Sequence, residues 1–142
     1  MNVCVKQTSP CTFLNLRRAA RAITEYYDSR ISQVGISISQ LTLLRYAESG
    51  ASTVTELAGH MRIDRTTLNR NLKPLAEKGF IAVVPGHDSR TREIMLTDAG
   101  RQKLAEALIL WAQVQHDVEK YLGAADVQKL TELTGKIETL HP

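Results

Sequence analysis

The sequence lacks the features that mark secreted and membrane proteins. Of its 142 residues only Cys4 and Cys11 are cysteines, which is too few and too terminal for the disulfide scaffold of a small secreted protein. No run approaches the roughly 20 apolar residues that span a bilayer, and the N-terminus has no secretory apolar core. These absences predict a cytoplasmic protein with no membrane partner.

Motifs for catalysis and metal binding are also missing. His60, His87, His116 and His141 show no His-x3-His spacing, so we expect no metal site. There is no nucleophile–base pair and no phosphate-cradling glycine loop, so we expect no cofactor and no enzymatic activity. The length and the ordinary apolar and charged fractions, 43% and 23%, predict a single domain over 1–142.

What the sequence does contain is a compact pattern between Thr53 and Thr97. Thr53 and Glu56 have the spacing of a capping box and predict the start of a short helix. Asp64 is a good N-cap for a second helix. The core side of that helix is predicted from a narrow stripe at about 100° per residue: Leu68, Leu72, Leu75 and Ala76.

The opposite side of the second helix is polar. Its outward and flanking residues are Arg65, Thr66, Thr67, Asn69, Arg70, Lys73 and Glu77. Threonine, asparagine and arginine near a helix start are residue types that bond base edges and phosphates in a major groove. Pro74 has two readings, a kink inside this helix or the first residue of a separate turn.

A β-hairpin is predicted after the second helix. Gly79 suits the left-handed position past a helix end, and strands are expected over 80–84 and 92–96. The turn carries Arg90 at its tip with Arg92 behind it, so guanidinium groups reach a minor groove or phosphates. His87 is interpreted as a solvated residue near phosphate.

Charge is concentrated in the same region. Between Arg62 and Arg92 there are seven Lys/Arg and three Asp/Glu, a balance of +4 in a chain whose net charge is +3. The rest of the chain is therefore close to neutral, which is typical of a localised DNA-binding face.

The chain resembles the MarR (multiple antibiotic resistance regulator) family of transcriptional regulators. The resemblance rests on Asp-Arg-Thr-Thr-Leu-Asn-Arg-Asn-Leu-Lys-Pro-Leu over 64–75, Glu-Lys-Gly over 77–79, Asp-Ser-Arg over 88–90 and Leu-Thr-Asp-Ala-Gly over 96–100. It covers nearly the whole chain and implies a mainly α fold with a small β wing. By resemblance the helix from Asp64 reads the major groove, Arg90 enters the minor groove, and Asp88 helps to hold the wing arginines.

The regions on either side of the winged helix-turn-helix lobe (37–97) are expected to form the dimer. Long helices with a three–four apolar spacing are predicted in 11–34 and 98–142, with a break at Gly123. They have more apolar face than one chain is expected to bury. A twofold homodimer presents two reading helices to an inverted-repeat operator with half-sites about 10 bp apart. The resemblance implies a repressor, although some relatives activate.

The signal is left open by the sequence. A small aromatic or phenolic effector is one reading, with a pocket formed by Arg17, Arg21, Tyr26, Tyr27 and Trp111, although the three aromatic residues also fit ordinary core packing. Oxidation of Cys11, with Cys4 or a partner chain, is the alternative; a merely tolerated thiol is the simpler reading. We favour the effector, because by resemblance Phe13 stands where peroxide-sensing relatives have their cysteine. A further alternative is a winged helix for protein contact or nonspecific DNA binding.

Overall fold

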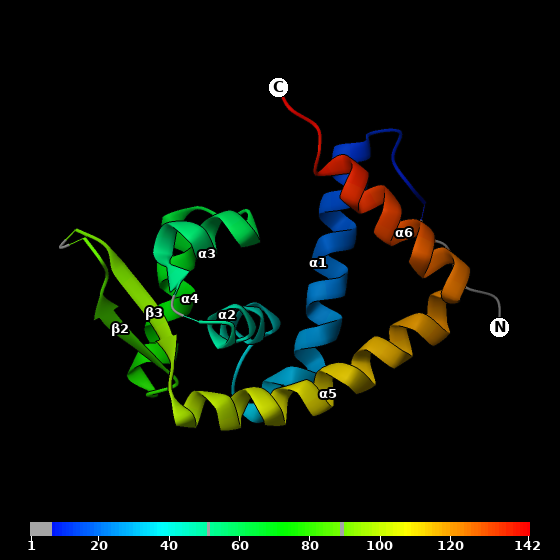
Figure 1. Ribbon diagram of the computed structural model, residues 1–142. Helices are drawn as coiled ribbons and strands as arrows, with labels where there is room; N and C mark the ends of the chain where they lie inside the picture. The colour runs from blue at the N-terminus through cyan, green and yellow to red at the C-terminus, as the bar shows by residue number, and fades with distance from the viewer. Residues whose placement is uncertain (1–6, 51, 89) are drawn as a thin grey trace.

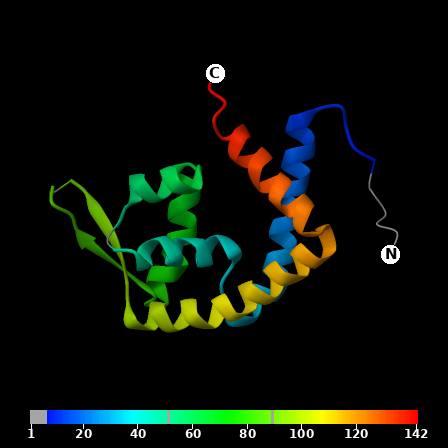
Figure 2. The ribbon, with the colours of Figure 1, turned by 45° about the vertical axis from the view of Figure 1, so that its right-hand side comes forward.

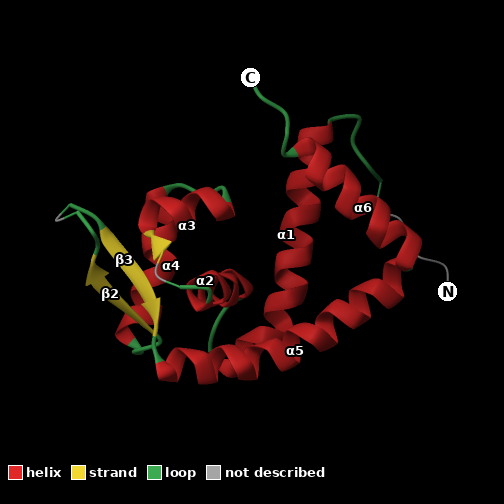
Figure 3. Ribbon diagram, viewed as in Figure 1, coloured by secondary structure: helices red, strands yellow, loops and turns green. Residues whose placement is uncertain are grey.

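The structure is a computed structural model that describes residues 7–50, 52–88 and 90–142. It is mainly helical with one small antiparallel sheet (Figures 1 and 3), which confirms the predicted fold class. The helices are α1 (Thr12–Ile31), α2 (Ile38–Glu48), α3 (Val54–Met61), α4 (Arg65–Glu77), α5 (Asp98–Leu122) and α6 (Ala124–Ile137), with one 3-10 turn, η1 (Ser32–Val34), after α1. The strands are β1 (Ser52–Thr53), β2 (Ile81–Pro85) and β3 (Arg92–Leu96).

The winged lobe consists of α2, α3, α4 and the sheet, and α1 with α6 stands apart from it (Figures 1 and 2). The long α5 runs from the base of the sheet past α2 and α1, and α6 folds back from its far end. The sheet order is β1-β3-β2, with Ile81 opposite Leu96 and Pro85 opposite Arg92. Within the described residues no helix is long and apolar enough to cross a membrane.

The predicted helix starts are confirmed by their hydrogen bonds, including a second capping box that the spacing of Ser37 and Gln40 predicts. The Ser37 hydroxyl accepts from the Gln40 N–H at 3.1 Å, and the Gln40 side chain accepts from the Ser37 N–H at 3.0 Å. Thr53 and Glu56 make the same reciprocal pair, both at 3.1 Å. Each box satisfies two N–H groups that have no partner inside the helix, so both starts are specified by local sequence.

The core of the lobe is apolar and continuous. It is built from α2, α3, α4 and the inner face of the hairpin together with the end of α1 and the start of α5, and its fully buried side chains include Ile31, Leu44, Leu57, Leu68, Leu75, Ile94 and Leu104. The stripe predicted for α4 is confirmed at Leu68, Leu72 and Leu75, but Ala76 is exposed. Ala76 lies at the edge of the stripe and faces an open groove beside the sheet.

Hydrogen bonds and a close packing contact join the start of α5 to the base of the wing. The Thr97 hydroxyl donates to the Gly79 carbonyl at 2.6 Å and accepts from the Gly100 N–H at 3.0 Å. A Cβ at Gly100 would lie 2.0 Å from the Phe80 carbonyl oxygen. Glycine is therefore required for this close approach between α5 and the wing.

Several predicted boundaries differ from the structure. The first strand of the hairpin begins at Ile81 rather than at Phe80, because the Phe80 N–H closes the preceding helix on the Leu75 carbonyl at 2.9 Å. The first helix, which the apolar spacing predicts from Phe13 to about Gln33, ends at Ile31. Strand β1 was not predicted, because it is only two residues long and Thr53 is also the N-cap of α3.

Polar contacts hold α1 against α5 and α2. The Tyr27 hydroxyl donates to Gln115, whose amide donates to Glu119 at 2.9 Å. Burial, and next the negative charge of Glu119, raise the pKa of Tyr27 above its ordinary value, so the phenol keeps its proton. The Asp28 carboxylate accepts from the Ile38 N–H at 2.7 Å, which fixes the start of α2 to the end of α1.

Candidate nucleic-acid interface

The first turn of α4 is fixed by Asp64. One carboxylate oxygen accepts from the Thr67 N–H at 2.7 Å and the other accepts from the Thr67 hydroxyl at 3.1 Å. The backbone hydrogen bond from Thr67, and then the one from its side chain, lower the pKa of Asp64. The hydroxyl proton of Thr67 is thus used within the cap, and only its lone pairs remain for a ligand.

The exposed face of α4 is cationic and polar, as predicted. Successive helical residues differ by about 100°, so the exposed side chains share one arc beside the buried leucines, with Arg65 at the edge nearest Leu72 and Arg70 farthest from it: Arg65, Asn69, Lys73, Thr66 and Arg70. Lys73 lies 4.0 Å from Glu77, and both are well exposed, so water screens the pair and Lys73 stays available to an anion. This is the side-chain set with which a helix reads bases and phosphates.

The side chain of Arg65 also contacts α3, which the sequence did not reveal. Its guanidinium donates to the Thr55 hydroxyl of α3 at 2.5 Å. This bond joins the first turns of α3 and α4, so Arg65 helps to set the angle between the two helices. A role in reading bases requires the side chain to leave that contact.

Pro74 lies inside α4, so the reading as the start of a separate turn is wrong. The helix continues to Glu77, and the Lys78 N–H closes it on the Pro74 carbonyl at 3.0 Å. Proline has no N–H, so the Arg70 carbonyl loses its usual partner four residues on. The interruption spans Arg70 to Pro74 and leaves the first turn of α4 closed, with the Leu68 N–H bonded to the Asp64 carbonyl at 3.0 Å.

The tip of the wing is organised by Asp88. Its carboxylate accepts from the Arg90 N–H at 3.2 Å, and its carbonyl accepts from the Thr91 N–H at 3.0 Å. Asp88 therefore holds the backbone of Arg90 and leaves the side chain exposed. His87 and Arg92 are exposed as well, so the wing presents several polar groups to solvent at its end.

A groove of about 300 Å³ separates α4 from the wing. Its floor is apolar, with Leu72 and Ile94, and its rims carry Asn69 and Lys73 on α4 and Arg92 on β3. The groove could not be predicted from the sequence, because its walls come from elements whose pairing depends on tertiary packing. Of the predicted DNA contacts, it brings Asn69 and Lys73 of the helix beside Arg92 of the wing.

The predicted effector residues are not brought together within one chain. Arg17 and Arg21 line a shallow groove on α1, where Arg21 pairs with Glu25 at 3.0 Å. Tyr26 is nine residues from Arg17, about 180° around the helix. Tyr27 faces α5, and Trp111 is partly exposed on α5.

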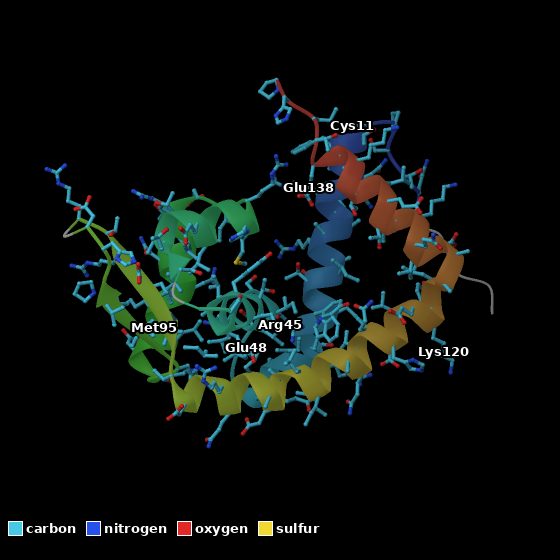
Figure 4. The ribbon with its side chains drawn as sticks, in the orientation of Figure 1. Cys11, Arg45, Glu48, Met95, Lys120 and Glu138 are labelled. Carbon is cyan, nitrogen blue, oxygen red and sulfur yellow. The ribbon has the colours of Figure 1, made fainter. Side chains whose placement is uncertain are left out.

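Cys11 is the N-cap of α1 and is exposed at the outer end of that helix (Figure 4). Its side chain makes no cap hydrogen bond. Cys4, the predicted oxidation partner, lies outside the described residues.

The capped reading helix, the strand-paired wing and the cationic face between them define a winged helix-turn-helix DNA-binding protein. The sequence model of the MarR family matches residues 36–91. The transcriptional regulator MosR of M. tuberculosis, solved in complex with DNA, is 33% identical; the match covers 90% of this chain and 96% of MosR, with a TM-score of 0.77. This chain belongs to the MarR family and is a DNA-binding transcriptional regulator.

One further relative agrees with this assignment, and a further solved structure shares the fold. YwoH of Bacillus subtilis, an uncharacterised helix-turn-helix transcriptional regulator, is 25% identical over 92 residues, which are 64% of this chain and 67% of YwoH. BpsR of Bordetella bronchiseptica, whose DNA binding is regulated by 6-hydroxynicotinic acid, has the same fold with a TM-score of 0.84 at 20% identity; the match covers 96% of this chain and 99% of BpsR.

Proposed function

We propose that the chain is a homodimeric repressor that pairs through α1, α5 and α6 and binds an inverted-repeat operator. The observation that carries this proposal is that α6 buries none of its residues in the single chain. An amphipathic helix of 14 residues needs a partner surface for its apolar face. Among the described elements α6 packs mainly on the end of α5, so a second copy is the partner that this family fold favours.

The exposed apolar side chains support the same interface. Most of the large ones lie on α1, α5 and α6 or directly after α6: Phe13, Leu14, Ile23, Tyr26, Ile109, Trp111, Tyr121, Leu122, Leu130, Leu133 and Leu140. Phe13 is 67% exposed and Tyr121 63%. A surface of this size and composition is typical of a protein–protein interface rather than of a surface that stays in water.

The dimer interface is tested by a pair of glutamate variants. Leu133→Glu places a charge on the exposed apolar face of α6 and is expected to give folded monomers, since Leu133 is half-exposed in the single chain. Ile109→Glu is the control, because Ile109 is 65% exposed on α5 and lies roughly 160° around the helix from Trp111. Sedimentation of a dimer for Ile109→Glu and a monomer for Leu133→Glu is the expected result; a dimer for both variants contradicts the interface.

We infer that a small aromatic acid or phenol is the releasing signal. The fold is shared with BpsR, which responds to 6-hydroxynicotinic acid. The α1 groove offers Arg17 as a cation without a pairing carboxylate among the described residues, while Arg21 is paired with Glu25 at 3.0 Å. Because Tyr26 lies on the opposite side of α1 from Arg17, a pocket that uses both residues takes one from each copy of the dimer.

The signal is tested by operator release. Benzoate and 6-hydroxynicotinate are expected to release wild type and Cys11→Ser at the same concentrations, and Arg17→Ala to raise the concentration required. The exposed Cys11 favours oxidation as a second candidate signal. Release of wild type by micromolar peroxide, reversed by a reductant and abolished in Cys11→Ser, would establish the redox signal instead.

A further inference from the structure

Arg62 has an unusual backbone conformation. It ends α3 with φ 50° and ψ 45°, in the left-handed region. It is the only non-glycine residue with positive φ in the part of the chain that the structure describes. The other residues with positive φ there are glycines: Gly35, Gly50, Gly79 and Gly123. The left-handed region is unfavourable for a residue with a Cβ and costs glycine nothing. An arginine at this position is therefore strained where a glycine would be relaxed.

The turn itself does not need the arginine side chain. The Arg62 N–H bonds to the Gly59 carbonyl at 3.2 Å, and the Ile63 N–H bonds to the Ala58 carbonyl at 3.1 Å. These are main-chain bonds of the kind that glycine makes equally well at a helix C-terminus. The reason for an arginine must lie in what its side chain contacts outside the turn.

The side chain of Arg62 is exposed to solvent. Among the described residues no hydrogen bond or ion pair involves the Arg62 guanidinium. Asp64, the carboxylate closest in sequence, has both oxygens engaged with Thr67. The guanidinium therefore keeps its full capacity to bind an external anion.

The location of Arg62 indicates which anion. Its turn joins α3 to the start of α4, three residues before Arg65 of the reading face. In Figures 1 and 2 this turn lies at the upper end of the lobe, the end to which the wing tip also extends. When the start of α4 enters a major groove, the turn in front of it lies at the rim of the groove, where the sugar–phosphate backbone runs.

We propose that Arg62 binds a DNA phosphate from the helix-turn-helix turn, and that this contact is the reason for a strained arginine in place of glycine. The inference rests on the DNA-binding function and adds a positioning contact outside the base-reading face of α4. An arginine–phosphate contact fixes the register of a protein on the duplex without reading sequence. Arg62 should therefore contribute equally on operator and on random DNA.

Arg62→Gly tests the backbone strain and the phosphate contact separately, because it relieves the strain and removes the cationic side chain. Its melting temperature is expected to rise above that of wild type. Its affinity is expected to fall by the same factor on operator and random duplex. The slope of log affinity against log salt should shrink by about one unit per head, hence about two for a dimer. Arg62→Lys is expected to keep most of the wild-type slope.

Arg101→Ala is the matched control, since Arg101 is an exposed arginine on the first turn of α5, at the opposite end of the lobe from the wing tip. It should leave the slope unchanged. A wild-type slope for Arg62→Gly, or a melting temperature below that of wild type, would overturn the inference. Failure of the wild type itself to bind duplex DNA would instead contradict the DNA-binding function on which it rests.

Discussion

At the residue scale, sequence reading on α4 depends on a few side chains held by their neighbours. Arg70 lies on the exposed face of α4, four residues before Pro74, in a helix that begins at the Asp64 cap. The cap fixes where the helix starts and therefore where Arg70 is presented.

Arg70→Ala is expected to weaken operator binding by about 1–3 kcal/mol if the guanidinium pairs with a guanine, with a much smaller loss on random duplex. The measurement is a titration of both DNAs at one salt concentration. An equal loss on the two DNAs would show that Arg70 only holds phosphate.

Asp64 is expected to make stability depend on pH in the acid range. Its hydrogen bonds with Thr67 lower its pKa in the folded chain, so the ionised carboxylate stabilises the fold. That stabilisation is present above the unfolded pKa of about 3.9 and is lost as the pH falls through the lower folded value. In thermal melts the melting temperature of Asp64→Asn should therefore fall less than that of wild type when the pH is lowered from about 5 to about 2. An equal fall for the two proteins would contradict this role of Asp64.

At the scale of elements, the wing and α5 depend on each other. Gly100→Ala drives a Cβ into the Phe80 carbonyl, so we expect a destabilisation of roughly 1–3 kcal/mol or more. Gly135→Ala in α6 is the control, because nothing lies within 4 Å of the added Cβ and the change should be neutral or stabilising by up to about 1 kcal/mol. Equal denaturation midpoints for the two variants would show that α5 can move away from the wing without cost.

The wing acts as a separate cationic element. Arg90→Ala removes an exposed guanidinium from its tip without removing the Asp88 bonds, which are made to the backbone. We expect weaker binding and a salt dependence about one unit shallower per wing. Unchanged affinity and slope would exclude the wing tip from the interface.

The elements also show what the sequence could and could not predict. The Ser37, Thr53 and Asp64 caps were predictable because each is a local hydrogen bond over three residues. Strand β1, the Arg65–Thr55 bond and the groove beside α4 were not, because they depend on how distant segments pack. The position of Tyr26 opposite Arg17 on α1 was available from helical spacing alone.

At the scale of the whole molecule, the single chain has one DNA-reading lobe and one large apolar surface on the helices away from it. The lobe has its own buried core, whereas α6 has none of its residues buried. Pairing two chains through α1, α5 and α6 would cover that surface and place two reading heads on one duplex. An inverted-repeat operator matches this twofold arrangement.

The most direct test of the account is the stoichiometry on DNA. An operator selected from random duplexes by binding would be compared with a duplex that carries one half-site, using sedimentation of the labelled DNA. The account predicts two chains bound together on an inverted repeat with half-sites about 10 bp apart, and far weaker binding to the half-site. One chain bound with equal affinity to both duplexes, or no preference over random DNA, would contradict it.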